Sequence, residues 1–301
     1  MNRASLCKRT AAVAVACLLW TPGFAQSEKV TIRMTPQPNQ TVRMRTVQEN
    51  EVEVSFEPAG PLTAAAGPMK LITKTVFGIT QKSGAATAQG NIEAEVVYDE
   101  INAEASMNGQ VMPSNDVGGT FLGKKLSVTF DKQGKVLDVK VPPDIGVPQE
   151  AFKQVLESMY GNLPSLSLSV GETTTVPLDF TLPLPIPGAA SLKMDGVVKH
   201  TLVSVQQEAA GRIAKVDHTI EGKMLSDVEV PLPTGKVKMN LDFTINGGGS
   251  MLMDLEKGFA RSSESKATFE GKIKAVDASN SAQVPPMNLK GTTKTTISTT
   301  N

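Results

Sequence analysis

Apolar and polar residues alternate along much of this chain, and that period of two limits the fold more than any other feature. In residues 236–245 the apolar members are Val237, Met239, Leu241, Phe243 and Ile245. Shorter stretches of the same kind lie at 30–34, 52–56, 92–98, 126–130 and 269–275. Alternation is typical of strands with one buried and one wet face, and such strands form antiparallel sheets. We therefore expect a mainly β protein, built as a large curved antiparallel sheet or a half-barrel.

Short turn sequences separate these predicted strands. Asp131–Gly134 lies between two apolar runs and predicts a tight hairpin, and Asp254–Gly258 predicts a second one. The run Gly247–Gly249 has the composition of a phosphate-binding loop, but no helix pattern and no lysine follow it. We interpret it as a flexible hairpin turn.

One segment has the spacing of a helix instead. Between Pro148 and Tyr160 one apolar stripe is formed by Ala151, Phe152, Val155, Leu156, Met159 and Tyr160. Pro148 suits the first position of a helix, and Gly161 suits the residue just past its end. We expect one amphipathic helix over about 148–160, packed against the concave side or the open end of the curved sheet.

The first 25 residues have the layout of a cleavable signal peptide. Arg3, Lys8 and Arg9 precede the apolar run 10–20, and small residues around Ala25 form a cleavage site. The apolar run is too short to span a membrane, and no later segment reaches the length of a transmembrane helix. We expect cleavage after Ala25 and a periplasmic or secreted protein. Because Cys7 and Cys17 leave with the signal, the mature chain is expected to be free of cysteine.

Pro- and Gly-rich stretches divide the rest of the chain. Residues 26–57 are expected to form an N-terminal strand pair, 58–69 a linker, and 70–280 the main β domain. The threonine-rich tail, 281–301, is expected to be either an edge strand or disordered.

The charge and the reactive side chains exclude several classes of function. The chain has 30 basic and 30 acidic residues without a basic cluster, which argues against nucleic acid as a partner. It has two histidines and no Gly-x-Ser-x-Gly elbow, so we expect no metal, no cofactor and no nucleophilic catalysis. A catalytic pair of carboxylates stays an alternative, because a sequence does not show which acidic side chains lie close together in the folded chain. An enzyme is therefore not expected, with a carboxylate-dependent hydrolase as the remaining enzymatic alternative.

The two histidines differ in how they fit the alternation of apolar and polar residues. His218 shares the apolar phase of its strand and is interpreted as a core histidine, or else as a polar group that orients a ligand. His200 lies in an ambiguous stretch, 197–205, and is interpreted as solvent-facing or at the rim of a sheet.

Methionine is the unusual apolar choice here, with 13 residues against two tyrosines and one tryptophan. Its flexible side chain fills irregular cores or lines surfaces that accept varied apolar shapes. Met251 and Met253 lack the repeated methionines or adjacent histidines of a copper(I) site, so they are interpreted as core residues. For an apolar ligand, the candidate binding residues on the predicted apolar faces are His218, Met239, Phe243, Phe152 and Met159.

Two resemblances add to these expectations. The stretch Val170-Gly171-Glu172-Thr173 precedes a strand and follows the strands 126–130 and 136–141. Over about residues 90–275 this order resembles an uncharacterised exported bacterial β-rich family, a domain of unknown function, whose Ser-Trp pair is replaced here by Thr173 and Thr174. More loosely, long antiparallel strands with one helix are similar to the periplasmic lipoprotein-carrier half-barrels. That second resemblance implies a helix against the concave face of the sheet and transfers no site residue.

Three functions are compatible with these expectations. The first is a periplasmic protein that binds or carries a lipid or other apolar molecule in its curved sheet. The second is an envelope structural or interaction module, which has a filled core, envelope proteins as partners and no ligand. The third is the carboxylate-dependent hydrolase.

Overall fold

The computed structural model describes residues 28–57, 67–113, 121–145, 149, 153, 156, 165–183, 191–209, 211–232, 235–276 and 285–300. Nearly all of these residues form strands. The strands are β1 (Val30–Ile32), β2 (Thr41–Phe56), β3 (Met69–Ala86), β4 (Ile92–Met107), β5 (Gln110–Val111), β6 (Lys125–Phe130), β7 (Val136–Lys140), β8 (Leu166–Leu168), β9 (Thr173–Pro183), β10 (Ser191–Glu208), β11 (Gly211–Leu232), β12 (Gly235–Asp254), β13 (Phe259–Ala275) and β14 (Met287–Thr300). A single 3-10 turn, η1, covers Pro143–Ile145. The expectation of a mainly β fold with a large antiparallel sheet is confirmed.

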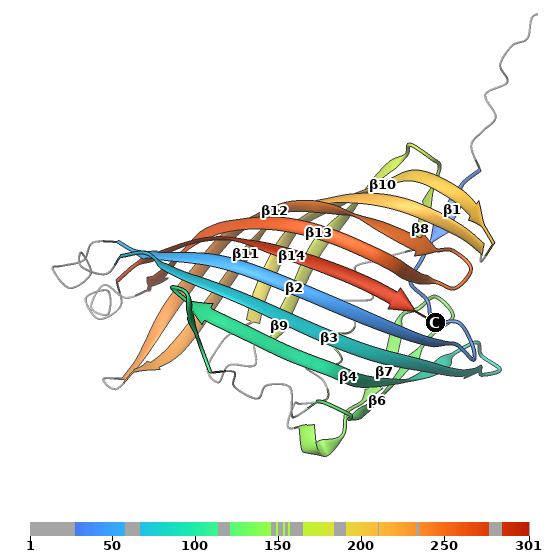
Figure 1. The fold of residues 1–301 in the computed structure, drawn as a ribbon, viewed down its shortest axis with the longest axis horizontal. Coiled ribbons are helices and arrows are strands. Elements are labelled where there is room, and N and C mark those ends of the chain that lie inside the picture. Colours follow the sequence, from blue (N-terminus) through green and yellow to red (C-terminus); the bar gives the residue numbers. More distant parts are fainter. Residues whose placement is uncertain are drawn as a thin grey trace, which may run out of the picture.

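Twelve of these strands form one antiparallel sheet (Figure 1). Its order is β7-β6-β4-β3-β2-β14-β13-β12-β11-β10-β9, with β5 beside β4. Two meanders, one from each half of the chain, join where β2 pairs with β14. The threonine-rich tail therefore forms a central strand, and the expectation of an edge strand or disorder is wrong. The paired threonines of this strand suit a central position because branched side chains pack well on both faces of a pleated surface.

The chain leaves the sheet at one edge and returns at the other. It runs from β7 through η1 to β8, which pairs with β1 in a separate two-stranded sheet, and re-enters the large sheet at β9. In Figure 1 the edge strand β9 passes behind the central strands, so the sheet curls, but its edges do not pair and it is not closed into a barrel. The edge strand β9 carries Pro177 and Pro183, which lack the N–H that a central strand needs.

The predicted helix falls mostly outside the described residues. Gln149, Lys153 and Leu156 have helical backbone, and Leu156 packs against the hydrophobic cluster of β4, β6 and β7. The helix as a whole stays a prediction. Among the residues that the structure does describe, there is no helix with the length and apolar character needed to cross a lipid bilayer.

Two hydrophobic clusters fill the same end of the sheet, on the right in Figure 1. The larger cluster lies where β1 and β8 pack on β10–β13, and the smaller one lies on β4, β6 and β7. Met251 and Met253 belong to the larger cluster, with 8 % and 1 % of their surfaces exposed, which confirms their interpretation as core residues. Both clusters lie on one face of the sheet, which we call the inner face.

The predicted turns have two outcomes. The hairpins at Asp131–Gly134 and Asp254–Gly258 are confirmed, since each closes with a backbone hydrogen bond from its glycine to its aspartate, of 3.0 and 2.9 Å. The interpretation of Gly247–Gly249 as a hairpin turn is wrong. These residues lie in the middle of β12 and pair with β11 and β13 on either side.

Candidate functional site

The face opposite the inner face, which we call the outer face, is charged and wet. Lysines and glutamates of neighbouring strands form ion pairs across it, among them Lys70–Glu51 at 2.7 Å and Lys290–Glu53 at 3.2 Å. Such exposed pairs contribute little each, about 0–1 kcal/mol, but together they keep this face in water.

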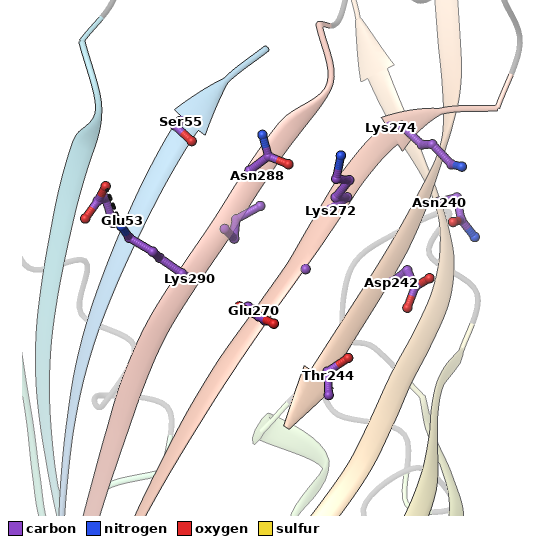
Figure 2. Close-up of a pocket in the computed structure, with 12 residues that line it drawn as sticks. Glu53, Ser55, Asn240, Asp242, Thr244, Glu270, Lys272, Lys274, Asn288 and Lys290 are labelled. Carbon is purple, nitrogen blue, oxygen red and sulfur yellow. Dashed lines mark ion pairs between the residues drawn. The ribbon is translucent and has the colours of Figure 1, made fainter. Parts of the chain in front are cut away.

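A shallow hollow of about 470 Å³ lies on the outer face. Figure 2 shows that its side chains come from β2, β14, β13 and β12, with Glu53 paired to Lys290. Lys272, which lines the hollow, donates a hydrogen bond of 2.8 Å to Glu57 and lowers the pKa of that carboxyl. A hydrolase acid requires the opposite, a pKa raised by an apolar setting. Polar and charged side chains make up most of the lining of the hollow, which lies on the solvated outer face.

The inner face carries two rows of apolar side chains and glycines that cross the sheet. Residues that pair from strand to strand form a cross-sheet row, and neighbouring rows lie two residues apart along each strand. The first apolar row consists of Leu178, Gly196, Gly222, Ile245, Phe269, Gly291, Val52 and Leu71. The second apolar row consists of Met194, Met224, Phe243, Gly271, Leu289, Val54 and Met69. Eight strands at about 4.8 Å spacing give the first row an arc of about 34 Å.

Most members of the two apolar rows are only partly buried. Leu178, Met194 and Phe243 are 5–8 % exposed, whereas Ile245, Phe269 and the members on β2, β3 and β14 have intermediate exposure. The two hydrophobic clusters thus fill one end of the inner face. The two apolar rows lie beyond those clusters, toward the other end of the sheet.

Glycines let the sheet bend toward its inner face. A Cβ atom on Gly271 would lie 2.1 Å from the Asp242 carbonyl oxygen of the neighbouring strand, and one on Gly249 would lie 2.1 Å from the Glu264 carbonyl oxygen. Both positions face inward, where curvature brings neighbouring strands together, so only a residue without a side chain fits there. The apolar rows therefore line a concave surface.

A row of polar side chains crosses the inner face between the filled end and the apolar rows. We call the following residues the polar belt: Thr174, His200, His218, Ser265, Thr295, Gln48 and Thr75, with Thr293, Asn50 and Thr73 in the next row. Gly249 stands between His218 and Ser265 in the belt and adds no side chain. Gln48 donates to Asn50 at 3.3 Å, and Asn50 donates to Thr73 at 3.0 Å.

The two histidines of the chain face each other in this belt. They are directly paired across β10 and β11, with ring centroids 6.3 Å apart. His200 is 4 % exposed, so its interpretation as a solvent-facing or rim residue is wrong. The sequence did not show which face of β10 His200 occupies, because this strand has valines on both faces. A bulge between Leu202 and Ser204 also exchanges the residues that point to each face.

Burial disfavours the charged form of both imidazoles. Burial lowers the pKa of His200 below its ordinary 6.5, and a charge on His218 would lower it further. Burial also lowers the pKa of His218, against an opposing effect of Asp217. Because each ring is partly withdrawn from water, protonation costs more in the folded chain than in the unfolded one.

A pH dependence of stability follows from these shifts. With histidine pKa values below 6.5 in the folded state, the unfolded chain binds more protons near pH 6. The free energy of unfolding is therefore expected to hold above about pH 6.5 and to fall as the pH drops below it. Urea titrations at about pH 7.5 and about pH 5.5 measure this fall. The double variant His200→Leu, His218→Leu is expected to lose it, and an unchanged fall in that variant contradicts the assignment.

The structure places three of the five predicted ligand residues on the inner face. His218 lies in the polar belt, Phe243 in the second apolar row, and Met239 on the same face of β12 farther from the belt. Phe152 and Met159 lie outside the described residues. A role of these residues in ligand binding stays a prediction.

Sequence reasoning missed His200, Asn50 and the bending role of the glycines. A signal for Asn50 exists in the sequence, because Thr46, Gln48 and Asn50 are three consecutive polar residues in a phase of β2 that is apolar at Met44 and Val52. Within the described part of the chain, no group of three or more His, Cys, Asp or Glu side chains is arranged to hold a metal.

Comparison with known proteins identifies no family for this chain. No protein-family model matches the chain, and no curated protein matches it at a significant level. Among solved structures the chain is similar to lipovitellin, in a structure described as lipid–protein interactions in lipovitellin, with a TM-score of 0.47 and 14 % identity. The match covers 88 % of this chain and 25 % of that one, so the chain spans about a quarter of the lipovitellin chain.

Proposed function

We propose that this protein binds a lipid with long hydrocarbon chains on the concave inner face of its sheet and carries it in the periplasm. The observation that carries the proposal is the pair of apolar rows, which cross seven or eight strands and retain partial exposure. An apolar concavity with a few polar groups is the usual form of a site for a small apolar ligand.

The two faces of the sheet support a lipid over a protein as the occupant. The described members of the apolar rows include no Asp, Glu, Lys or Arg, whereas the outer face carries ion pairs between neighbouring strands. Protein interfaces usually add a polar rim and charged or hydrogen-bonding groups at about one bond per 100–200 Å². A surface this uniformly apolar, and flexible through its methionines, fits hydrocarbon of varied shape.

Export to the periplasm is part of this proposal and rests on the sequence alone. The charged start, the short apolar run and the small residues before Gln26 support it. Those residues lie outside the part of the chain that the structure describes. The envelope module without a ligand is the alternative, and it would need these apolar rows to be covered permanently.

The test begins with the protein as it is produced in the cell. The chain is purified without detergent, examined by native mass spectrometry, and extracted for lipid. We expect a bound lipid at close to one per chain, and displacement of that lipid by a fluorescent apolar probe. A clean apoprotein that also fails to bind the probe would overturn the proposal and favour the envelope module.

A further inference from the structure

The polar belt contains buried hydrogen-bonding atoms that the described protein does not satisfy. Neither ring nitrogen of His200 has a hydrogen-bond partner, although the residue is 4 % exposed. The buried hydroxyl oxygen of Thr293, in the neighbouring belt row, also lacks one. Buried polar groups in proteins are nearly always bonded, and leaving one unbonded costs about 1–3 kcal/mol. His200 lies on β10 and Thr293 on β14, so unbonded polar atoms occur at two separate places along the belt, and both need an explanation.

The neighbouring side chains do not supply the missing bonds. His218 lies directly opposite, but the rings are tilted by 45° with centroids 6.3 Å apart and do not hydrogen-bond. On the far side of His218, β12 presents Gly249, and in the next row it presents Gly247, so no side chain reaches in from there. Among the described residues, the donors and acceptors of the belt therefore border two positions of β12, Gly247 and Gly249, that contribute no side chain.

The chemistry of the belt selects the type of group that it can bind. Its members on the described strands are histidine, threonine, serine, glutamine and asparagine, and none is Asp, Glu, Lys or Arg. A neutral imidazole offers one N–H donor and one acceptor, while the amides and hydroxyls offer both. An ionic headgroup would lose its hydration here without gaining an opposite charge, which is costly. Esters and hydroxyls lose far less and match these donors and acceptors.

We propose that the polar belt hydrogen-bonds the uncharged polar part of the bound lipid, its ester carbonyl and hydroxyl groups, while the hydrocarbon chains lie along the two apolar rows. This inference rests on the proposed function and narrows the ligand to neutral amphipathic lipids such as acylglycerols. The belt sits next to the filled end of the inner face, so the polar part of the ligand enters deepest and the chains point toward the other end.

Competition between matched ligands tests the preference directly. The full chain, freed of lipid, is loaded with a fluorescent apolar probe and titrated with monolauroylglycerol, laurate or dodecyltrimethylammonium, below their micellar concentrations. These have similar chains and differ in the charge of the polar part. We expect the glycerol ester to displace the probe at a concentration about tenfold lower than either ion, the equivalent of about one good hydrogen bond. Equal displacement by all three overturns the inference.

The histidines provide a readout that needs no substitution. Because the chain has only two, selective labelling of histidine gives NMR signals from His200 and His218 alone. We expect both imidazole signals to shift on addition of monolauroylglycerol. Displacement of the probe with unmoved histidine signals places the ligand elsewhere and also overturns the inference.

Variants separate the belt from the apolar rows. The double variant His200→Leu, His218→Leu is expected to lose the tenfold preference, so that the glycerol ester and the two ions displace the probe at similar concentrations. Thr219→Val, on the outer face beside His218, is the matched control and should keep it. If far-UV circular dichroism shows that the double variant is unfolded, Asn50→Leu, with Asn246→Leu on the outer face as its control, tests the opposite side of the belt. Failure of the wild-type chain to bind any apolar probe defeats the proposed function itself, whereas probe binding without preference defeats only the inference about the belt.

Discussion

Ile245→Lys is expected to weaken binding of an apolar probe at least tenfold while the chain stays folded. Ile245 lies in the middle of the first apolar row, between Gly222 and Phe269, and is only partly buried. In the free protein a lysine there can extend its ammonium group into water along its flexible stem. With hydrocarbon seated on the row, that ammonium loses its hydration, and every 1.4 kcal/mol of this cost is a factor of about ten in affinity. Fluorescence titration of the probe gives the affinity, and a urea titration gives the stability.

The neighbouring residue supplies the control. Asn246 is exposed on the outer face of the same strand, so Asn246→Lys adds the same charge within one residue and is expected to leave probe affinity unchanged. Equal weakening by both variants would point to a general effect of charge. No weakening by Ile245→Lys would remove the inner face from the binding site.

The faces of the strands could be predicted from the sequence because the period of two is a local property. Val237 to Ile245 alternate in the sequence, and the same five apolar side chains share the inner face of β12 in the structure. Neighbouring strands cannot be predicted in this way. The pairing of β2 with β14 joins residues more than 200 positions apart. Thr293, Thr295 and Ile297 share one face of β14, but their sequence does not identify the strand that pairs with them.

The glycine run in β12 failed as a turn signal for a physical reason. Glycine is common in turns because it has no Cβ atom, and that same property allows a backbone to approach its neighbour closely. Local sequence does not distinguish these uses, because the second depends on how β11 and β13 lie against β12. The position of Gly249, where a Cβ atom would meet the Glu264 carbonyl oxygen, becomes meaningful only once the sheet is built.

The candidate site was only half accessible to sequence reasoning for a related reason. His218, Met239 and Phe243 could be assigned to an apolar face from their own strands. The polar belt consists of residues from seven strands, namely β9, β10, β11, β13, β14, β2 and β3. These residues are recognised as one row only when the register of the assembled sheet is known. A bulge of one residue in β10 was enough to hide His200, because a shift of one residue exchanges the faces of a strand.

Phe130→Ala is expected to cost about 3–5 kcal/mol of the free energy of unfolding, the usual range for removing a fully buried phenylalanine. Phe130 is 0 % exposed and packs with Val128, Val136 and Val139 in the cluster that attaches the β6–β7 hairpin to β4. Only six residue pairs join β4 to β6, so apolar packing contributes much of what holds this edge of the sheet. Urea unfolding at equilibrium measures the loss.

The control for that substitution lies in the same hairpin. Leu137 is 41 % exposed on the opposite face of β7, so Leu137→Ala is expected to cost less than about 1 kcal/mol. Equal losses from the two variants would show that the cluster is not the core of this edge. Because the apolar rows lie on strands beyond β4, chains with Phe130→Ala that remain folded at low urea are expected to bind the apolar probe with wild-type affinity. Loss of binding before loss of the central sheet would instead show that the inner face is held in its curved shape by this edge.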